Sequence, residues 1–227
     1  MQLEEFLNRV RGRLIVSCQA LHGTPMDDPY VIRAVAQSVE LAGACALRIN
    51  GPENVRAVRQ ACSVPIVGIN KTEDRTQVYI TPTFDLAAQV AAAGADVVAV
   101  QATEPRRGKC DPLDELVNRI HAEFGLPVVA DVSNVAEGEA AIAAGADIVA
   151  STLAGYVGNG QCSDGPDVQL VRELAALGRP VIAEGKYHTP QQVLSALDAG
   201  ATSVVVGTAI TMPDRITRWF VNALDAR

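Results

Sequence analysis

The segment Ala93-Gly94-Ala95-Asp96-Val97-Val98 recurs 51 residues later as Ala144-Gly145-Ala146-Asp147-Ile148-Val149. Shorter copies occur at Ala42-Gly43-Ala44-Cys45 and Ala199-Gly200-Ala201, so the four central glycines are separated by 51, 51 and 55 residues. In these copies, a glycine suited to the left-handed end of a helix precedes a run typical of a strand. The chain therefore consists of four similar quarters, each with a helix that leads into a strand.

A second strand is expected in each quarter. Apolar runs open after Pro65, Pro127 and Pro180, and a run from Leu14 supplies the fourth. Between the strands, apolar residues recur at helical spacing, as in the stretch Leu113–Ile120. The sequence thus predicts eight short strands that alternate with eight helices.

This alternation predicts parallel strands joined by helical crossovers. About 250 residues is the usual size for closing such strands into a ring, and the chain has 227. We therefore expect one (β/α)8 TIM barrel domain that spans residues 1–227. An open doubly wound sheet is the alternative, but four near-equal quarters are harder to place on it.

Helix boundaries are also marked. An N-cap residue precedes a proline at Asp28-Pro29, Asp111-Pro112 and Thr189-Pro190, and Thr189 with Gln192 has the spacing of a capping box. A stripe near the N-terminus predicts a short helix that caps the lower mouth of the barrel: Leu3, Phe6, Leu7 and Val10. A C-terminal stripe predicts a last helix that packs on the barrel and could extend to a homodimer contact: Ile216, Trp219, Phe220, Ala223 and Leu224.

Composition and charge exclude several classes of protein. Hydrophobic residues make up 48% of the chain and aromatic residues only 4%, which excludes a disordered or collagen-like chain and predicts an aliphatic core. The 19 basic and 26 acidic residues give a net charge of −7, which disfavours nucleic acid or an anionic membrane as a partner. No stretch approaches the ~20 apolar residues of a membrane helix, so we expect a cytoplasmic protein.

Metal and cofactor motifs are missing from the sequence. His22, His121 and His188 do not end two strands together, so no metal site is expected. No GxGxxG follows a strand and no GxxxxGK[ST] occurs, so we expect no cofactor. Five scattered cysteines without CxxC spacing predict neither a disulfide framework nor zinc: Cys18, Cys45, Cys62, Cys110 and Cys162.

Charged and amide side chains stand where the expected strands end. In a barrel of this kind, the carboxyl ends of the strands form the active-site face. We therefore expect Arg48, Lys71, Asp131 and Glu184 to point into one cavity, where burial and neighbouring charges can shift their pKa values. Other polar residues are expected at the same face: Gln19, Gln101, Thr103, Ser151 and Thr152.

Glycine-rich turns follow the last two strands, at Gly185-Lys186 and Gly207-Thr208. Backbone N–H groups next to glycine can approach a phosphate closely, and the loops after strands seven and eight are the usual place for one in a barrel. A phosphorylated small molecule is therefore the expected ligand.

At this level of detail the chain resembles the N-acetylmannosamine-6-phosphate 2-epimerases of amino-sugar catabolism. The resemblance runs from Leu14 to Phe220. The segments that carry it are Leu14-Ile-Val-Ser-Cys-Gln-Ala-Leu21, Leu47-Arg-Ile-Asn-Gly51, Pro65-Ile-Val-Gly-Ile-Asn-Lys71, Tyr79-Ile-Thr-Pro82, Ala130-Asp-Val-Ser133, Ser151-Thr-Leu-Ala-Gly-Tyr156, Val181-Ile-Ala-Glu-Gly185 and Val206-Gly-Thr-Ala-Ile-Thr211.

The resemblance implies roles for individual residues. Lys71 corresponds to the catalytic lysine of that family and Glu184 to its acidic partner. Residues implied to hold or polarise the sugar are Gln19, Arg48 and Asp131, while Thr103 and Arg107 keep their places in the motif after strand four. The phosphate is implied to lie near Gly185, Gly207 and Thr208, with Lys186 where the family usually has arginine. Gln101 stands where the family usually has aspartate.

The implied reaction is inversion at C2 of an open-chain 2-acetamido sugar phosphate. The C2 hydrogen is adjacent to the C1 aldehyde, so its removal leaves an enolate that can be protonated again on the other face. Lys71 is expected to act as the acid/base, with Glu184 orienting the sugar or moving protons. One-residue and two-residue routes both remain open. Two other readings are a Schiff-base aldolase that uses Lys71 and a phosphosugar-binding barrel without chemistry.

Overall fold

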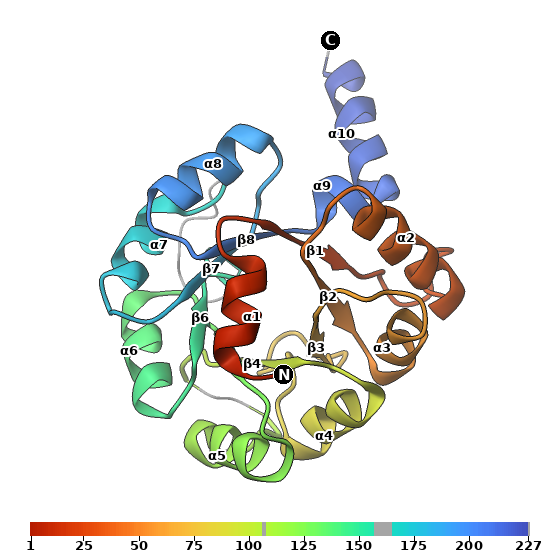
Figure 1. The fold of residues 1–227 in the computed structure, drawn as a ribbon. Coiled ribbons are helices and arrows are strands. Elements are labelled where there is room, and N and C mark those ends of the chain that lie inside the picture. The colour runs from red at the N-terminus through yellow and green to blue at the C-terminus, as the bar shows by residue number, and fades with distance from the viewer. Residues whose placement is uncertain (106–107, 157–164, 227) are drawn as a thin grey trace.

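The expected barrel is confirmed. The computed structural model describes residues 1–105, 108–156 and 165–226. Eight parallel strands pair in chain order, and the eighth pairs with the first, so that the ring closes (Figure 1). The strands are β1 (Leu14–Cys18), β2 (Ala46–Asn50), β3 (Ile66–Ile69), β4 (Val97–Gln101), β5 (Val128–Asp131), β6 (Ile148–Ala150), β7 (Val181–Glu184) and β8 (Ser203–Val206).

Helices surround this ring. They are α1 (Leu3–Val10), α2 (Pro29–Leu41), α3 (Pro52–Arg59), α4 (Phe84–Ala93), α5 (Leu113–Phe124), α6 (Val135–Ala143), α7 (Val168–Ala175), α8 (Pro190–Asp198), α9 (Thr208–Thr211) and α10 (Pro213–Asp225). In the parts of the chain that the structure describes, no helix is both long and apolar enough to cross a membrane.

The sequence repeat has a structural counterpart. After α4, Asp96 accepts hydrogen bonds from the guanidinium of Arg59 at 2.7 Å and from the N–H of Ile66 at 2.9 Å. One quarter later, Asp147 accepts from the N–H of Val128 at 2.8 Å and lies 2.8 Å from His121 Nε2. Each aspartate therefore ties the start of its own strand to the neighbouring strand and to a preceding helix.

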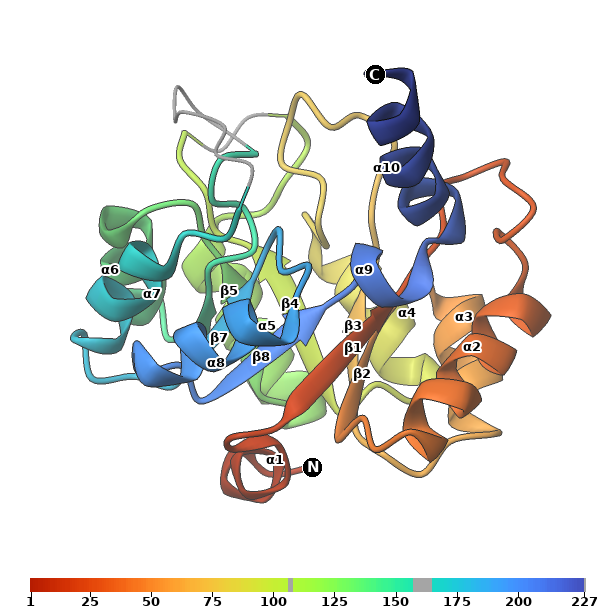
Figure 2. The ribbon, with the colours of Figure 1, turned by 90° about the horizontal axis from the view of Figure 1, so that it is seen from above.

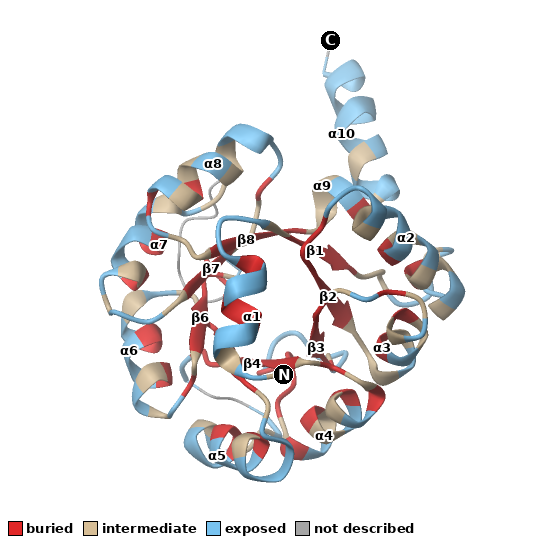
Figure 3. Cartoon of the chain, viewed as in Figure 1, coloured by how far each residue is buried: buried red, intermediate tan, exposed pale blue. Residues whose placement is uncertain are grey.

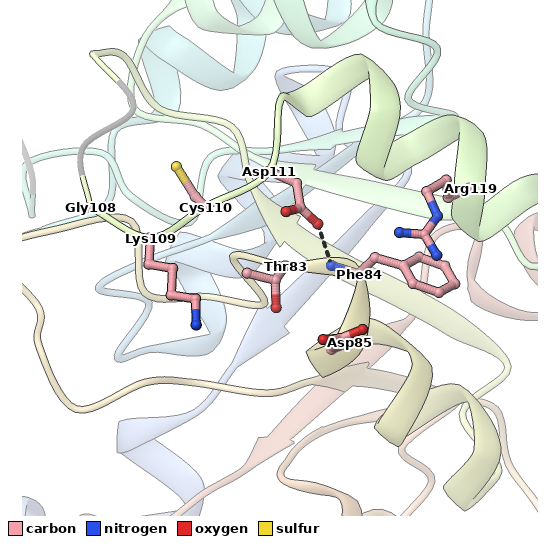
Figure 4. A pocket seen from close by; sticks show the side chains of 8 residues that line it. All are labelled: Thr83, Phe84, Asp85, Gly108, Lys109, Cys110, Asp111 and Arg119. Atoms are coloured by element: carbon pink, nitrogen blue, oxygen red, sulfur yellow. Dashed lines mark hydrogen bonds between the residues drawn. The ribbon is translucent and has the colours of Figure 1, made fainter.

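The predicted N-cap residue is confirmed at two of the three helix starts. Asp28 caps α2 by accepting from the N–H of Tyr30 at 2.7 Å, and Thr189 with Gln192 forms the capping box of α8. The prediction for Asp111 is wrong, because Pro112 takes the position before α5. The Asp111 carboxylate turns instead to the neighbouring helix and accepts from the first N–H of α4 at 2.7 Å (Figure 4).

The predicted N-terminal helix caps the lower mouth of the barrel. Phe6, Leu7 and Val10 of α1 are buried and belong to the same apolar cluster as inward-facing strand residues such as Ile15 and Ile182. Figure 2 shows α1 at one end of the barrel and the loops that follow the strands at the other. One end of the barrel is thus sealed by apolar packing, which leaves the opposite end for a ligand.

The expected packing of the last helix on the barrel is wrong. None of the residues of α10 is buried, and the helix projects away from the ring (Figure 3). The indole of Trp219 packs against the imidazole of His188, with the centres of the two aromatic rings 4.7 Å apart. Pro213 begins a new helix directly after the short α9, and this change of direction carries the apolar stripe out into solvent.

The cysteines carry no cross-link in the described residues. Free thiols are found at Cys18, Cys45, Cys62 and Cys110. Cys162 lies outside the described residues.

Candidate active site

The site lies inside the barrel at the carboxyl ends of the strands. Side chains of a strand alternate between two faces, and on β2 the inward series runs from the apolar Ala46 to Arg48 and Asn50. A cavity of about 960 Å³ opens above this polar layer. The change from apolar to polar along the inward face therefore divides the barrel interior into a packed core and a binding cavity.

Arg48 is the central cation of the site. It is 2% exposed and donates from Nη1 to Asp131 Oδ1 at 3.0 Å and from Nη2 to Oδ2 at 2.5 Å. Its Nη1 also lies 3.0 Å from Glu184 Oε2. Burial by itself would lower the pKa of Arg48, but the charges of Asp131 and Glu184 raise the pKa above its ordinary value. The guanidinium thus stays charged and holds two carboxylates in place.

Glu184 is the less fully compensated of the two carboxylates. Burial raises its pKa above the ordinary value, the cation of Arg48 opposes this, and the negative charge of Asp131 adds to the rise. Asp131, which is fully buried, accepts a further hydrogen bond from the hydroxyl of Thr152. The raised pKa makes Glu184 suited to exchange a proton near neutral pH.

Lys71 follows β3 and reaches into the same cavity. Its backbone N–H donates to Asn50 Oδ1 at 3.0 Å, and its Nζ donates to Gln19 Oε1 at 2.7 Å. Burial and the positive charge of Arg48 lower the pKa of Lys71 to about 8. A substantial fraction of the amine is therefore neutral near pH 7.5, as a general base requires.

The segment after Lys71 is held in place by hydrogen bonds at its C-terminal end, near Tyr79 and Ile80. Lys71 and Ile80 form an antiparallel bridge, and Thr81 has a φ of +47° although it is β-branched and fully buried. The amide oxygen of Gln101 accepts from the N–H groups of Tyr79 and Ile80 at 2.9 and 3.3 Å. Gln101 thus holds the backbone next to Lys71, a task that needs an acceptor oxygen and no charge.

The structure brings most of the predicted site residues to one cavity. Its lining includes Gln19, Arg48, Lys71, Glu184, Gly185, Lys186, Gly207 and Thr208. Asp131 lies behind Arg48, and Thr103 is buried behind Gln101, from whose amide it accepts at 2.7 Å. Arg107 lies outside the described residues.

The predicted phosphate cradle occupies one side of the cavity. Gly185 has a φ of +109°, and a Cβ on Gly207 would lie 3.2 Å from the Cβ of Ser17, so both turns favour glycine. Lys186 also has a positive φ, and its ammonium lies 5.0 Å from the centre of the Tyr156 ring. Both glycines line the cavity, and the ammonium of Lys186 lies over the ring of Tyr156, another lining residue.

Some lining residues were not identified from the sequence. Ser17 lies two residues after the inward-facing Ile15 of β1, so strand alternation could have found it. Tyr79 also lines the cavity, as do Met212, which lies between α9 and α10, and the α10 residues Arg215 and Trp219. The sequence did not assign these residues to the cavity, because their place at its rim depends on the path of a loop and on the direction in which the terminal helix leaves the barrel.

A second hollow of about 320 Å³ lies between α4 and α5 (Figure 4). Asp111 already occupies the N–H of Phe84 there. Arg119 lies 3.6 Å from the centre of the Phe84 ring and pairs with Glu123 at 3.1 Å. Asp111 and Arg119 each have a partner already, so the barrel cavity is the better candidate for the active site.

Comparisons with known proteins find relatives over nearly the whole chain. The family model described as "NanE: Putative N-acetylmannosamine-6-phosphate epimerase" matches residues 32–226. A protein of Cutibacterium acnes named "Putative N-acetylmannosamine-6-phosphate 2-epimerase" is 45% identical over 224 residues, which cover 97% of both chains. The "Bifunctional enzyme NanE/NanK" of Brucella melitensis is 44% identical over 225 residues, 99% of this chain. The present chain spans only 43% of that relative's length.

Solved structures give the same picture. The N-acetylmannosamine-6-phosphate 2-epimerase from Clostridium perfringens matches with a TM-score of 0.91 and 36% identity, covering 96% of this chain and 95% of that one. The thiamine phosphate pyrophosphorylase from Pyrococcus furiosus, at 16% identity and a TM-score of 0.62, shares the fold alone.

Proposed function

The chain belongs to the N-acetylmannosamine-6-phosphate epimerase family, and on that premise we propose that it interconverts N-acetylmannosamine 6-phosphate and N-acetylglucosamine 6-phosphate. This makes it an isomerase that inverts C2 of an N-acylated hexosamine phosphate. The observation that carries the proposal is a buried amine, Lys71, whose pKa of about 8 and contact with Gln19 place a usable base in the barrel cavity.

The reaction follows from the charges around that amine. Neutral Lys71 takes the C2 proton of the open-chain sugar and becomes an ammonium, while the electron pair moves to the C1 oxygen as an enolate. Arg48 supplies fixed positive charge next to the site, which stabilises the enolate oxygen. A proton is then returned to C2 on the opposite face, which gives the epimer with no net change in atoms.

Two routes supply the returning proton. In the first, the sugar rotates within the cavity so that its other face meets Lys71, which returns the proton. In the second, Lys71 and Glu184 lie on opposite sides of C2, and Glu184 donates the proton. The raised pKa of Glu184 is what the second route needs, since a protonated carboxyl can donate. A substrate with deuterium at C2, incubated in ordinary water, distinguishes the two routes. If a single residue removes and returns the proton, part of the deuterium appears in the product.

The remaining site residues are assigned by their positions. Gln19 and Arg48 lie within reach of the sugar, and Asp131 acts through Arg48 because it is fully buried. We assign the phosphate to Gly185, Lys186, Gly207 and Thr208, which line one side of the cavity. Thr103 and Arg107 are included in the proposed substrate-binding set because of their places in the sequence motif after β4.

Proton NMR in deuterated water tests the proposal. N-acetylmannosamine 6-phosphate is incubated with the protein and a chelator, and we expect the gluco epimer to form with loss of the C2 proton signal. Lys71→Gln should reduce the rate by about 10²- to 10⁴-fold. Exchange at the native rate in Lys71→Gln would refute the assignment of the base. A covalent adduct on Lys71 trapped by borohydride would instead support an aldolase.

The expected homodimer belongs to this proposal as well. Trp219, Phe220 and Leu224 of α10 are 40, 70 and 62% exposed, and such a stripe of apolar residues is typical of a contact surface. We expect light scattering to give the mass of two chains and Phe220→Asp to give one. The matched control is Leu41→Asp, on the exposed face of α2. A native protein with the mass of one chain would refute the dimer.

The cytoplasmic location remains a prediction, and cell fractionation tests it. The cofactor-free and metal-free reaction also remains a prediction, which the chelator in the NMR experiment addresses.

A further inference from the structure

Ser17 lines the cavity but has no role in the reaction proposed above. We propose that Ser17 is a positioning residue that acts through Gln19 to hold the amine of Lys71 in its working orientation. This inference rests on the proposed function for its kinetic consequences. Its geometric basis does not depend on the identity of the sugar.

The three side chains form a continuous chain of hydrogen bonds. Gln19 Nε2 donates to Ser17 Oγ at 2.6 Å, and Lys71 Nζ donates to Gln19 Oε1 at 2.7 Å. Ser17 lies in β1 and Gln19 directly follows the strand, and both side chains line the cavity. The amide of Gln19 therefore bridges from the first strand to the residue that follows the third.

The position of Ser17 is itself well determined. It is 5% exposed, and its backbone pairs with Arg48 on β2. Its carbonyl oxygen accepts from the hydroxyl of Thr211 at 2.7 Å. On the far side, Gly207 has no side chain, and a Cβ there would lie 3.2 Å from that of Ser17. The backbone that carries the Ser17 hydroxyl is thus fixed by neighbouring elements on both sides.

A fixed partner matters because a lysine side chain has many rotamers and loses conformational entropy when it is held in one. The amide of Gln19 has two chemically different ends. With its nitrogen engaged by Ser17, its oxygen faces Lys71 and accepts an N–H of the amine. If the amide were turned round, its NH₂ group would donate to the lone pair of the neutral amine, the same lone pair that must take the C2 proton.

The first test is a double-mutant cycle. In Ser17→Ala we expect kcat to fall about tenfold, the loss that one net hydrogen bond represents, with KM changed less than about twofold. Gln19→Ala should lose at least as much. Because Ser17 acts through Gln19, the double variant should be no slower than Gln19→Ala alone. Cys18→Ala is the matched control, since the side chain of Cys18 on the same strand packs outside the ring.

The second readout does not need turnover. The rate at which an amine-specific reagent labels Lys71 is followed against pH by peptide mass spectrometry. An oriented acceptor favours the ammonium form, so its loss in Ser17→Ala should lower the midpoint of the labelling curve. Cys18→Ala should keep the native midpoint.

Three results would overturn the inference. Additive losses in the double variant would show that Ser17 acts independently of Gln19. A rise in KM as the main effect of Ser17→Ala would show that the hydroxyl contacts the sugar. An unchanged labelling midpoint would show that Ser17 does not influence the amine. If the native protein fails to interconvert the two sugars, the proposed function falls, while the labelling curves still decide the role of Ser17.

Discussion

Replacing Lys71 by methionine should remove activity and change the pH dependence of stability in a calculable way. The side chain keeps its length and loses its charge. The ordinary pKa of lysine is 10.5 and that of Lys71 is about 8. Since each pH unit is worth about 1.4 kcal/mol, holding the ammonium in the folded cavity costs about 3 kcal/mol at pH 7.

The sign follows from proton binding. Below pH 8 the folded and unfolded states both hold the proton, and the full cost of the buried charge is present. Between pH 8 and 10.5 the unfolded chain binds more protons than the folded protein, so the native protein gains stability as the pH rises. At pH 9.5 the cost falls to about 1 kcal/mol. A methionine at this position has no such dependence.

The free energy of unfolding of Lys71→Met, taken relative to that of the native protein, should therefore depend on pH. This difference should be smaller by about 2 kcal/mol at pH 9.5 than at pH 7. A constant offset from packing or from the lost contact with Gln19 cancels in this comparison. Urea unfolding at 25 °C, followed by circular dichroism, measures both differences, and one transition is expected if residues 1–227 form a single domain. Lys109→Met, the same change at an exposed lysine, is the matched control. An equal stability difference at both pH values for Lys71→Met would refute the reasoning.

Three further changes test the fold and the buried charges. Asp131→Asn leaves the guanidinium of Arg48 without its main partner and should lower the free energy of unfolding by about 3 kcal/mol, as measured by urea unfolding; a loss below about 1 kcal/mol would contradict this. Gly68→Ala places a methyl group 2.7 Å from a neighbouring alanine side chain and should cost about 1–3 kcal/mol in the same assay. Thr189→Ala removes the capping box of α8 and should cost about 1 kcal/mol, and no change would show that the helix start is held by packing alone.

The ring of strands could be predicted because its signals are local. The Ala-Gly-Ala motifs place a helix end and a strand start within a few residues of each other, and their regular spacing specifies four quarters. Once the strands are parallel and closed, their carboxyl ends must meet at one face. This is why Arg48, Lys71 and Glu184 could be assigned to one cavity before any coordinates.

Two wrong predictions show the limit of such local rules. Asp111 has the sequence context of an N-cap for α5 but binds the first N–H of α4, because a carboxylate bonds to whichever donor lies nearest in space. The apolar stripe of α10 has the pattern of a packed helix, yet it faces solvent. Amphipathic spacing shows which face of a helix is apolar and leaves open what covers it.

The amino-acid sequence alone determined the element order, the closed ring and the charged side chains Arg48, Lys71 and Glu184 at one end of it. The tertiary structure decided which of these groups are partners. Arg48 and Asp131 are 83 residues apart in the chain yet share two hydrogen bonds, and Gln19 meets Lys71 across 52 residues. Backbone propensities act over a few residues, whereas the pKa of a buried amine depends on charges and acceptors that only folding brings within a few ångströms.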